Sequence, residues 1–151
     1  MVGGSRRKSR ELAMKLLYQH HLTHAALDRV CETFDEYREA PEGSRSFALV
    51  LARGVERHLA EIDGAITAAL EKWEFSRLAA IDTQIMRVAA FELLHCDDIP
   101  ANVTIDEAIE LSRQYSTGES AKFVNGVLGA LASKHAAHKI TRATRGGMLD
   151  S

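Results

Sequence analysis

The apolar stretch near the C-terminus, residues 122–131 with the sequence KFVNGVLGAL, has the period of a helix but contains an Asn and two Gly. A glycine inside a helix costs about 1 kcal/mol relative to alanine. Gly126 and Gly129 therefore predict the close approach of another helix backbone. Asn125 predicts a buried side chain that bonds backbone or a neighbouring helix. A helix packed in this way needs partner helices around it, so this segment constrains the fold strongly.

Helix is favoured along nearly the whole chain. The 151 residues include only two Pro, and Ala and Leu are abundant whereas runs of β-branched residues are scarce. With 46% hydrophobic residues, a chain of this length can bury one core, so we expect a single all-α domain. The predicted helices, about seven, cover residues 5–24, 26–39, 47–58, 63–70, 77–95, 101–115 and 120–133.

The chain is predicted to divide into a lead, one domain and a tail. We expect residues 1–5 to be a disordered lead, residues 6–134 to form the domain and residues 135–151 to be a flexible basic tail. The two thiols, Cys31 and Cys96, lack metal-ligand spacing, and the sequence has no apolar run of about 18 residues. These features predict a cytoplasmic protein that does not enter a membrane.

Two serines are the predicted caps of long helices. Ser5 precedes the first helix, and Ser76 follows the aromatic pair Trp73 and Phe75 at the start of the helix of residues 77–95. That helix is apolar almost all round, so we expect it at the centre of the core.

The net charge of -2 conceals two basic ends and an acidic middle. Residues 1–20 carry five Lys or Arg against one Glu, a charge of +4, and residues 134–151 carry four against one Asp, a charge of +3. The ten basic and nineteen acidic residues between them leave the middle at -9. Local charge therefore says more about partners than the overall charge does.

The strongest binding candidate is the basic start of the first helix. Arg6, Arg7 and Arg10 lie on one flank of that helix at 100° per residue, and Tyr18 lies on the same flank. Arginine pairs bidentately with phosphate and an aromatic ring stacks on unpaired bases, so this flank predicts contact with single-stranded RNA. The alternative, which the sequence leaves open, is a solvated helix start and a ring at the edge of the core.

The sequence has no pattern typical of catalysis, a metal or a cofactor. His20 and His24 share a helix face, but no carboxylate or Cys completes a ligand set. His95 and Cys96 are neighbours, and neighbours on a helix point about 100° apart, so they do not form a nucleophile and base. No P-loop, GxSxG or GxGxxG is present. We therefore expect a binding protein and no enzyme.

Polar residues interrupt the apolar helix of residues 77–95 at Asp82, Arg87 and Glu92, and Glu119 precedes the last helix. These side chains either satisfy one another within the fold or form the edge of an acidic surface for a basic partner. Our hypothesis assigns Asp82, Arg87 and Glu119 to a partner-binding surface.

Four blocks resemble, in their order and spacing, the NusB family of bacterial transcription antitermination factors. They are RRKSRELAMKLLYQ, WEFSRLAAIDTQIMRVAAFELL, DDIPANVTIDEAIELSRQY and SAKFVNGVLGALA. Together they span nearly the whole chain. The resemblance implies an all-helical fold of two packed three-helix subdomains.

The resemblance also implies a function without catalysis. A protein of this family would bind the boxA element of nascent ribosomal RNA leaders together with NusE, a ribosomal small-subunit protein. The complex would join NusA, NusG and RNA polymerase and allow transcription through terminators. The resemblance leaves open whether the free protein is a monomer or a homodimer.

The resemblance assigns residues to both surfaces. The positions matching RNA contacts are Arg6, Arg7, Arg10, Tyr18 and Phe123. Asp82 and Glu119 match acidic positions near the RNA and NusE surfaces. The chain departs from the family pattern at Asp106, where Asn is common, at Gly129, where Asp is usual, and at Ala101, where some relatives have a larger residue.

Two alternative functions remain open at this point. Similar domains form the RNA-binding front of ribosomal RNA cytosine methyltransferases, which would require a Rossmann-like domain after Ser151. The other alternative is a helical scaffold that binds proteins alone. Such a scaffold predicts no salt-dependent RNA affinity, whereas binding through several phosphates weakens steeply as salt rises.

Overall fold

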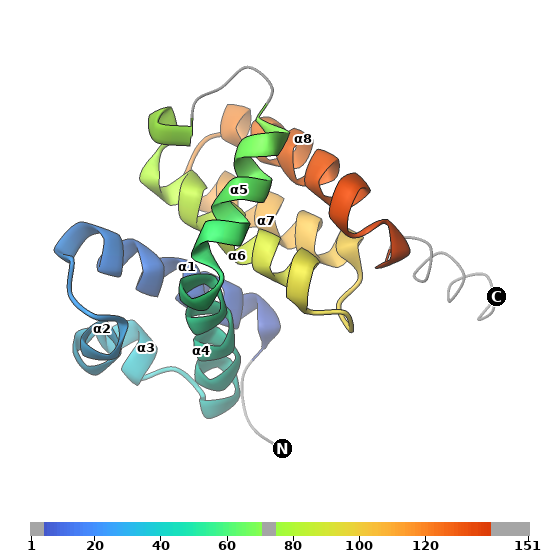
Figure 1. Ribbon diagram of the computed structural model, residues 1–151. Coiled ribbons are helices and arrows are strands. Elements are labelled where there is room, and N and C mark those ends of the chain that lie inside the picture. The colour runs from blue at the N-terminus through green and yellow to red at the C-terminus, as the bar shows by residue number, and fades with distance from the viewer. Residues whose placement is uncertain (1–4, 71–74, 140–151) are drawn as a thin grey trace. The chain divides into compact units, whose positions relative to one another are not determined.

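The computed structural model describes residues 5–70 and 75–139, and these form helices and no strand (Figure 1). The all-α prediction is confirmed. Trp73 lies outside the described residues, as do most of the predicted lead and the predicted tail beyond Lys139. No described helix is long and apolar enough to cross a membrane.

The chain separates into two compact units, with the boundary between Leu59 and Ala60. The helices of the first unit are α1 (Arg6–Thr23), α2 (Leu27–Thr33), α3 (Asp35–Arg38) and α4 (Glu42–Arg57). In this unit α1 packs along α4 and contributes Leu12 and Leu16 to the core, where α4 contributes Leu51; all three side chains are fully buried.

Ser5 caps α1 as predicted. Its hydroxyl oxygen accepts a hydrogen bond from the backbone N–H of Lys8 at 3.2 Å. The helix ends at His24, whose left-handed backbone (φ 60°) lets its N–H reach the carbonyl of His20. The hydroxyl of Ser9 donates to the carbonyl of Ser44 at 2.8 Å, which ties the start of α1 to α4.

The helix predicted over residues 26–39 is two helices, α2 and α3, separated by an extended residue at Phe34. The reason is a tertiary contact. On α3, Glu36 accepts hydrogen bonds from the ammonium groups of Lys8 and Lys15 on α1, at 3.0 and 2.9 Å. A continuous helix would not bend back to make both ion pairs, so a backbone break is needed there.

The second unit contains a 3-10 helix, η1 (Phe75–Arg77), and four α-helices. These are α5 (Leu59–Ala69), which begins at the boundary, α6 (Ala80–His95), α7 (Ala101–Tyr115) and α8 (Gly118–His135). The predicted break near residue 58 is confirmed, because α4 ends at Arg57 and α5 starts at Leu59. The described residues therefore contain eight α-helices where about seven were predicted.

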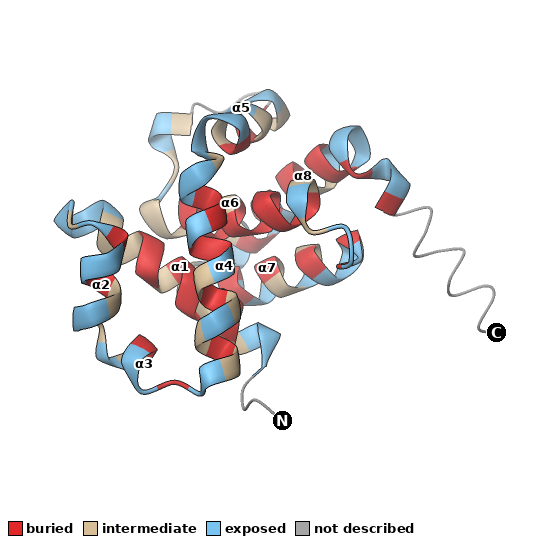
Figure 2. Ribbon diagram, turned by 60° about the horizontal axis from the view of Figure 1, so that its bottom comes forward, coloured by how far each residue is buried: buried red, intermediate tan, exposed pale blue. Residues whose placement is uncertain are grey.

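The central position predicted for the 77–95 helix is confirmed for α6. It packs against both α7 and α8, and Ile85, Met86 and Leu93 are almost fully buried (Figure 2). The predicted Ser76 cap is wrong, because residues 75–77 form the 3-10 helix and α6 begins only at Ala80. An apolar helix buried on several sides is held by packing, so it does not require a side-chain cap.

The start of α8 also differs from the prediction. Thr117 is its N-cap and accepts a hydrogen bond from the backbone N–H of Ser120 at 3.0 Å. The helix therefore begins at Gly118, two residues earlier than predicted. This shift places Glu119 in the first turn of the helix, where the helix dipole favours a negative charge.

The chain after α8 is packed over a longer stretch than predicted. Ala136 is fully buried and Lys139 is 2% exposed, with its ammonium group donating to the carbonyl oxygen of Glu92 at 2.9 Å. The tail predicted from residue 135 is therefore wrong over residues 135–139. The rest of that tail lies outside the described residues.

The prediction of close helix packing at the α8 glycines is wrong. A Cβ built on Gly126 or Gly129 would meet no atom within 4 Å, and Asn125 is exposed. The helix buries Val124, Val127 and Leu128 instead. The Asn and Gly positions thus lie outside the packed stripe of α8.

Candidate functional site

The basic flank predicted on α1 is only partly at the surface. Arg6 and Arg7 are exposed, and the guanidinium carbon of Arg6 lies 4.4 Å from the centre of the Phe47 ring on α4. Arg10 is only 5% exposed, and Tyr18 is half-buried. The helical angle placed the three arginines on one flank, but burial separates Arg10 from the other two.

The lysines of α1 are engaged within the first unit. Lys15 pairs with Glu11 at 3.0 Å, and both Lys8 and Lys15 pair with Glu36. Burial by itself raises the pKa of Glu36, but the hydrogen bonds and charges of Lys15 and Lys8 outweigh it and lower that pKa overall. The exposed positive charge at the start of α1 is therefore carried mainly by the arginines.

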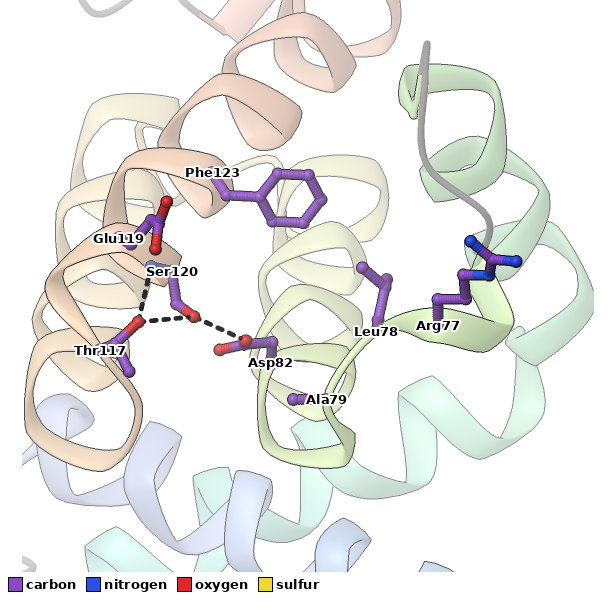
Figure 3. Close-up of a pocket in the computed structure, with 8 residues that line it drawn as sticks. All are labelled: Arg77, Leu78, Ala79, Asp82, Thr117, Glu119, Ser120 and Phe123. Atoms are coloured by element: carbon purple, nitrogen blue, oxygen red, sulfur yellow. Dashed lines mark hydrogen bonds between the residues drawn. The ribbon is translucent and has the colours of Figure 1, made fainter.

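A pocket of about 240 Å³ lies in the second unit, at the N-terminus of α8 (Figure 3). One wall comes from the segment that leads into α6 and the other from the first turns of α8. The lining residues are Arg77, Leu78, Ala79, Asp82, Thr117, Glu119, Ser120 and Phe123. The ring of Phe123 projects from α8 toward Leu78 on the opposite wall.

A hydrogen-bonded network joins the two walls. The hydroxyl of Ser120 donates to Oδ2 of Asp82 at 3.0 Å, and Thr117 Oγ1 lies 3.1 Å from the same hydroxyl oxygen (Figure 3). Asp82 is 6% exposed, and its Oδ1 accepts no hydrogen bond from the described residues. An unused carboxylate oxygen is a strong acceptor for a donor that a ligand brings to the pocket.

Arg87, predicted to contact a partner, directs its guanidinium into the protein. Its Nε and Nη2 donate to the two carboxylate oxygens of Asp63 on α5, at 2.9 and 2.8 Å. A third nitrogen lies 3.4 Å from Oε1 of Gln84, and the guanidinium lies 5.4 Å from the centre of the Phe75 ring. Arg87 thus holds α5 and the 3-10 segment on α6, and its place on a partner-binding surface is corrected.

Glu92 also has an internal role, as one of the sequence alternatives suggested. It is fully buried, and its carboxylate accepts a hydrogen bond from the hydroxyl of Thr104 on α7 at 2.9 Å. Of the polar residues on α6, only Asp82 lines the pocket.

The structure brings three of the predicted site residues together: Asp82, Glu119 and Phe123. Thr117 and Ser120 belong to the same pocket but were not predicted as site residues. Their spacing before an apolar helix is an N-cap signal and could have located them. The wall of residues 77–79 had no such signal, because it depends on the 3-10 turn before α6.

Together these features define a small all-helical protein with an exposed basic start to its first helix and an acid-containing pocket at the start of its last. The chain belongs to the NusB family, whose sequence profile matches residues 7–133. The four blocks that resembled this family all lie within or across that range, so the resemblance is confirmed.

Relatives and solved structures agree with this assignment. The transcription antitermination protein NusB of Geobacter sulfurreducens is 44% identical over 131 residues, covering 86% of this chain and 95% of that protein. The protein of the same name from Clostridium botulinum is 37% identical, covering 84% and 99%. The structure of Thermotoga maritima NusB, 38% identical, superposes with a TM-score of 0.82 over 91% of this chain and 98% of its own. A structure of NusB and NusE with double-stranded RNA, 24% identical, has a TM-score of 0.77 over 85% and 96%, which supports the fold.

Proposed function

We propose that this protein is a transcription antitermination factor that binds boxA-type single-stranded RNA together with NusE. In this proposal it acts in the cytoplasm, catalyses no reaction, and joins NusA, NusG and RNA polymerase in a larger complex. The observation that carries the proposal is the family match over most of the chain, with relatives named for antitermination.

The RNA would follow the exposed arginines of α1. Arg6 and Arg7 offer guanidinium groups that pair with phosphate oxygens. Tyr18 and Phe123 are half-buried rings that present a face on which an unpaired base can stack. Arg10, being buried, would support the shape of this flank more than it contacts phosphate.

NusE would bring a basic group to the pocket in the second unit. The unused Oδ1 of Asp82 and the exposed carboxylate of Glu119 are acceptors for a Lys or Arg side chain. Arg87 would contribute indirectly, because it holds the 3-10 segment that continues into the pocket wall. Partner binding thus depends on a wall that is itself built by an ion pair.

The test is binding of a fluorescent boxA-type RNA and of a scrambled RNA, each with and without NusE, at two salt concentrations. We expect sequence-selective binding that NusE strengthens and that weakens as salt rises. Absence of RNA binding under every condition would refute the proposal and favour a scaffold that binds proteins alone.

A further inference from the structure

A second cavity in the second unit lies between α5 and the last turns of α8. Its volume is about 510 Å³, and a smaller cavity of about 170 Å³ adjoins it and shares four of its residues. The residues lining the larger cavity are Glu61, Gly64, Ala65, Ala68, Leu94, His95, Lys134 and His135. The smaller cavity adds Ala69, Ala130 and Leu131. We call the two together the α5–α8 groove.

The α5–α8 groove exists because the side chains along it are small. On α5 the residues that line it are Gly64, Ala65, Ala68 and Ala69, at the i, i+4 spacing that places residues on one helix face. A Cβ built on Gly64 would meet no atom within 4 Å, so the space above this face is open. A stripe of this kind lets another helix approach closely, with its apolar side chains entering the groove.

The rim of the α5–α8 groove is positively charged at the α8 end. Lys134 and His135 form no ion pair among the described residues, whereas Glu61 on the opposite side is paired with His95 at 2.5 Å. Basic residues in the last turn of α8 also offset the helix dipole. The dipole accounts for the charges, but it does not account for a cavity of this size beside them.

We propose that the α5–α8 groove docks an amphipathic helix of a partner protein, with apolar side chains in the groove and acidic side chains facing Lys134 and His135. A nucleic acid fits less well. No aromatic residue lines the groove among the described residues, and the Glu61 carboxylate at the rim repels phosphate.

The α5–α8 groove is separate from the pocket assigned to NusE. Ser120 lines that pocket and Lys134 lines the groove, and fourteen residues of one helix place them about 21 Å apart. The protein could therefore hold a further protein through this groove while RNA and NusE occupy the sites proposed above.

The probes for the test are two synthetic peptides of equal length, each helical with Leu on one face, one carrying Glu and the other Lys on the opposite face. The intact protein is titrated with each peptide by calorimetry and by amide NMR. We expect the Glu peptide to bind, with shift changes concentrated at Ala65, Ala68 and Lys134, and the Lys peptide to bind at least tenfold more weakly.

Two variants and a matched control refine the test. Lys134→Glu should weaken the Glu peptide at least tenfold, and Ala68→Trp, which fills the groove from an exposed position, should remove binding. Lys122→Glu, the same charge change at an exposed position of α8, should leave it unchanged. All variants should bind boxA-type RNA as the parent does, which separates this inference from the proposed function.

Four outcomes would overturn the inference: equal binding of both peptides, binding of neither, shift changes confined to other residues, or no effect of either groove variant. Loss of RNA affinity in Lys134→Glu would also overturn it, because the groove would then be a nucleic-acid surface. Self-association of the protein that Ala68→Trp removes would overturn it as well, because the occupant would be a second copy of this chain.

Discussion

Asp82 shows how one residue can serve both the fold and a binding site. Its Oδ2 accepts the Ser120 hydroxyl and so joins α6 to the first turn of α8, while its Oδ1 has no partner among the described residues. Burying a carboxylate with a free acceptor costs stability. Such a cost is commonly retained where a ligand supplies the missing donor.

Asp82→Asn tests that interpretation at the residue scale. The amide keeps an oxygen that can accept from Ser120 but removes the negative charge, so we expect NusE affinity to fall by roughly tenfold or more with little change in melting temperature. Calorimetric titration of NusE measures the first quantity and thermal denaturation the second. Asp106→Asn, on the exposed side of α7, is the matched control and should bind NusE normally.

Gly129 tests the opposite case, a residue whose space is not used. Alanine at this position meets only open space and has the higher helix propensity, so Gly129→Ala should raise the free energy of unfolding by roughly 0.5 to 1 kcal/mol. Urea denaturation measures the change. A loss of stability would mean that the space above α8 is smaller than the structure indicates.

At the scale of elements, short connections are held by ion pairs between helices. The α3 helix has four residues and could not persist alone; Glu36 fastens it to Lys8 and Lys15 of α1. In the second unit Arg87 performs a similar function for α5 and the 3-10 segment. Both ion pairs join residues far apart in the sequence.

Arg87→Met tests the second of these contacts. The change leaves Asp63 partly buried without its partner, and breaking a fully buried pair costs about 3 to 5 kcal/mol, so a loss of roughly 1 to 3 kcal/mol is expected at this half-exposed site. NusE affinity should fall too, since the pocket wall loosens. Denaturation and calorimetric titration check the two effects. Restored NusE binding in Arg87→Lys would fit a positioning role, and unchanged binding in Arg87→Met would contradict it.

Glu36 makes the stability of the first unit depend on pH. Its pKa is lower in the folded protein than the usual value of 4.5, so the unfolded chain binds the proton more tightly. The stabilisation is therefore present above that usual value and is lost as pH falls through the lowered pKa. Comparing the unfolding free energy of the parent and of Glu36→Gln between pH 7 and pH 3 should show a gap that closes on acidification. A gap that stays constant would contradict this account.

At the scale of the whole molecule, charge is distributed unevenly along the chain. The overall charge is -2, but residues 1–20 carry +4, and the two exposed arginines of α1 lie in that segment. Attraction to phosphate acts over about 10 Å at 0.1 M salt, so a local basic segment can bind RNA on an acidic protein.

Reversing these charges should change the salt dependence of RNA binding. For Arg6→Glu with Arg7→Glu, we expect affinity to fall at least tenfold and the slope of log affinity against log salt to decrease by about 1.4, from about 0.7 for each lost phosphate contact on a single strand. Fluorescence anisotropy at several salt concentrations measures both. Arg57→Glu, exposed at the end of α4, is the control. An unchanged slope would remove Arg6 and Arg7 from the RNA surface.

Much of the helical pattern could be predicted from local sequence. The Ser5 cap, the break at residue 58, the bounds of α7 and the central position of α6 follow from side-chain spacing and capping chemistry, which act within a few residues. The Phe34 break, the burial of Lys139 and the open space at the α8 glycines did not, because each depends on what a distant segment places nearby.

The same division applies to the site. Residue types alone indicated that Arg6, Arg7, Asp82, Glu119 and Phe123 could bind, since guanidinium, carboxylate and aromatic groups carry that chemistry wherever they stand. Only the tertiary structure decided that Arg10 is buried and that Arg87 pairs with Asp63, because exposure and pairing are set by contacts across the fold. Helical periodicity tells which residues share a face, and packing decides which of those faces meets solvent.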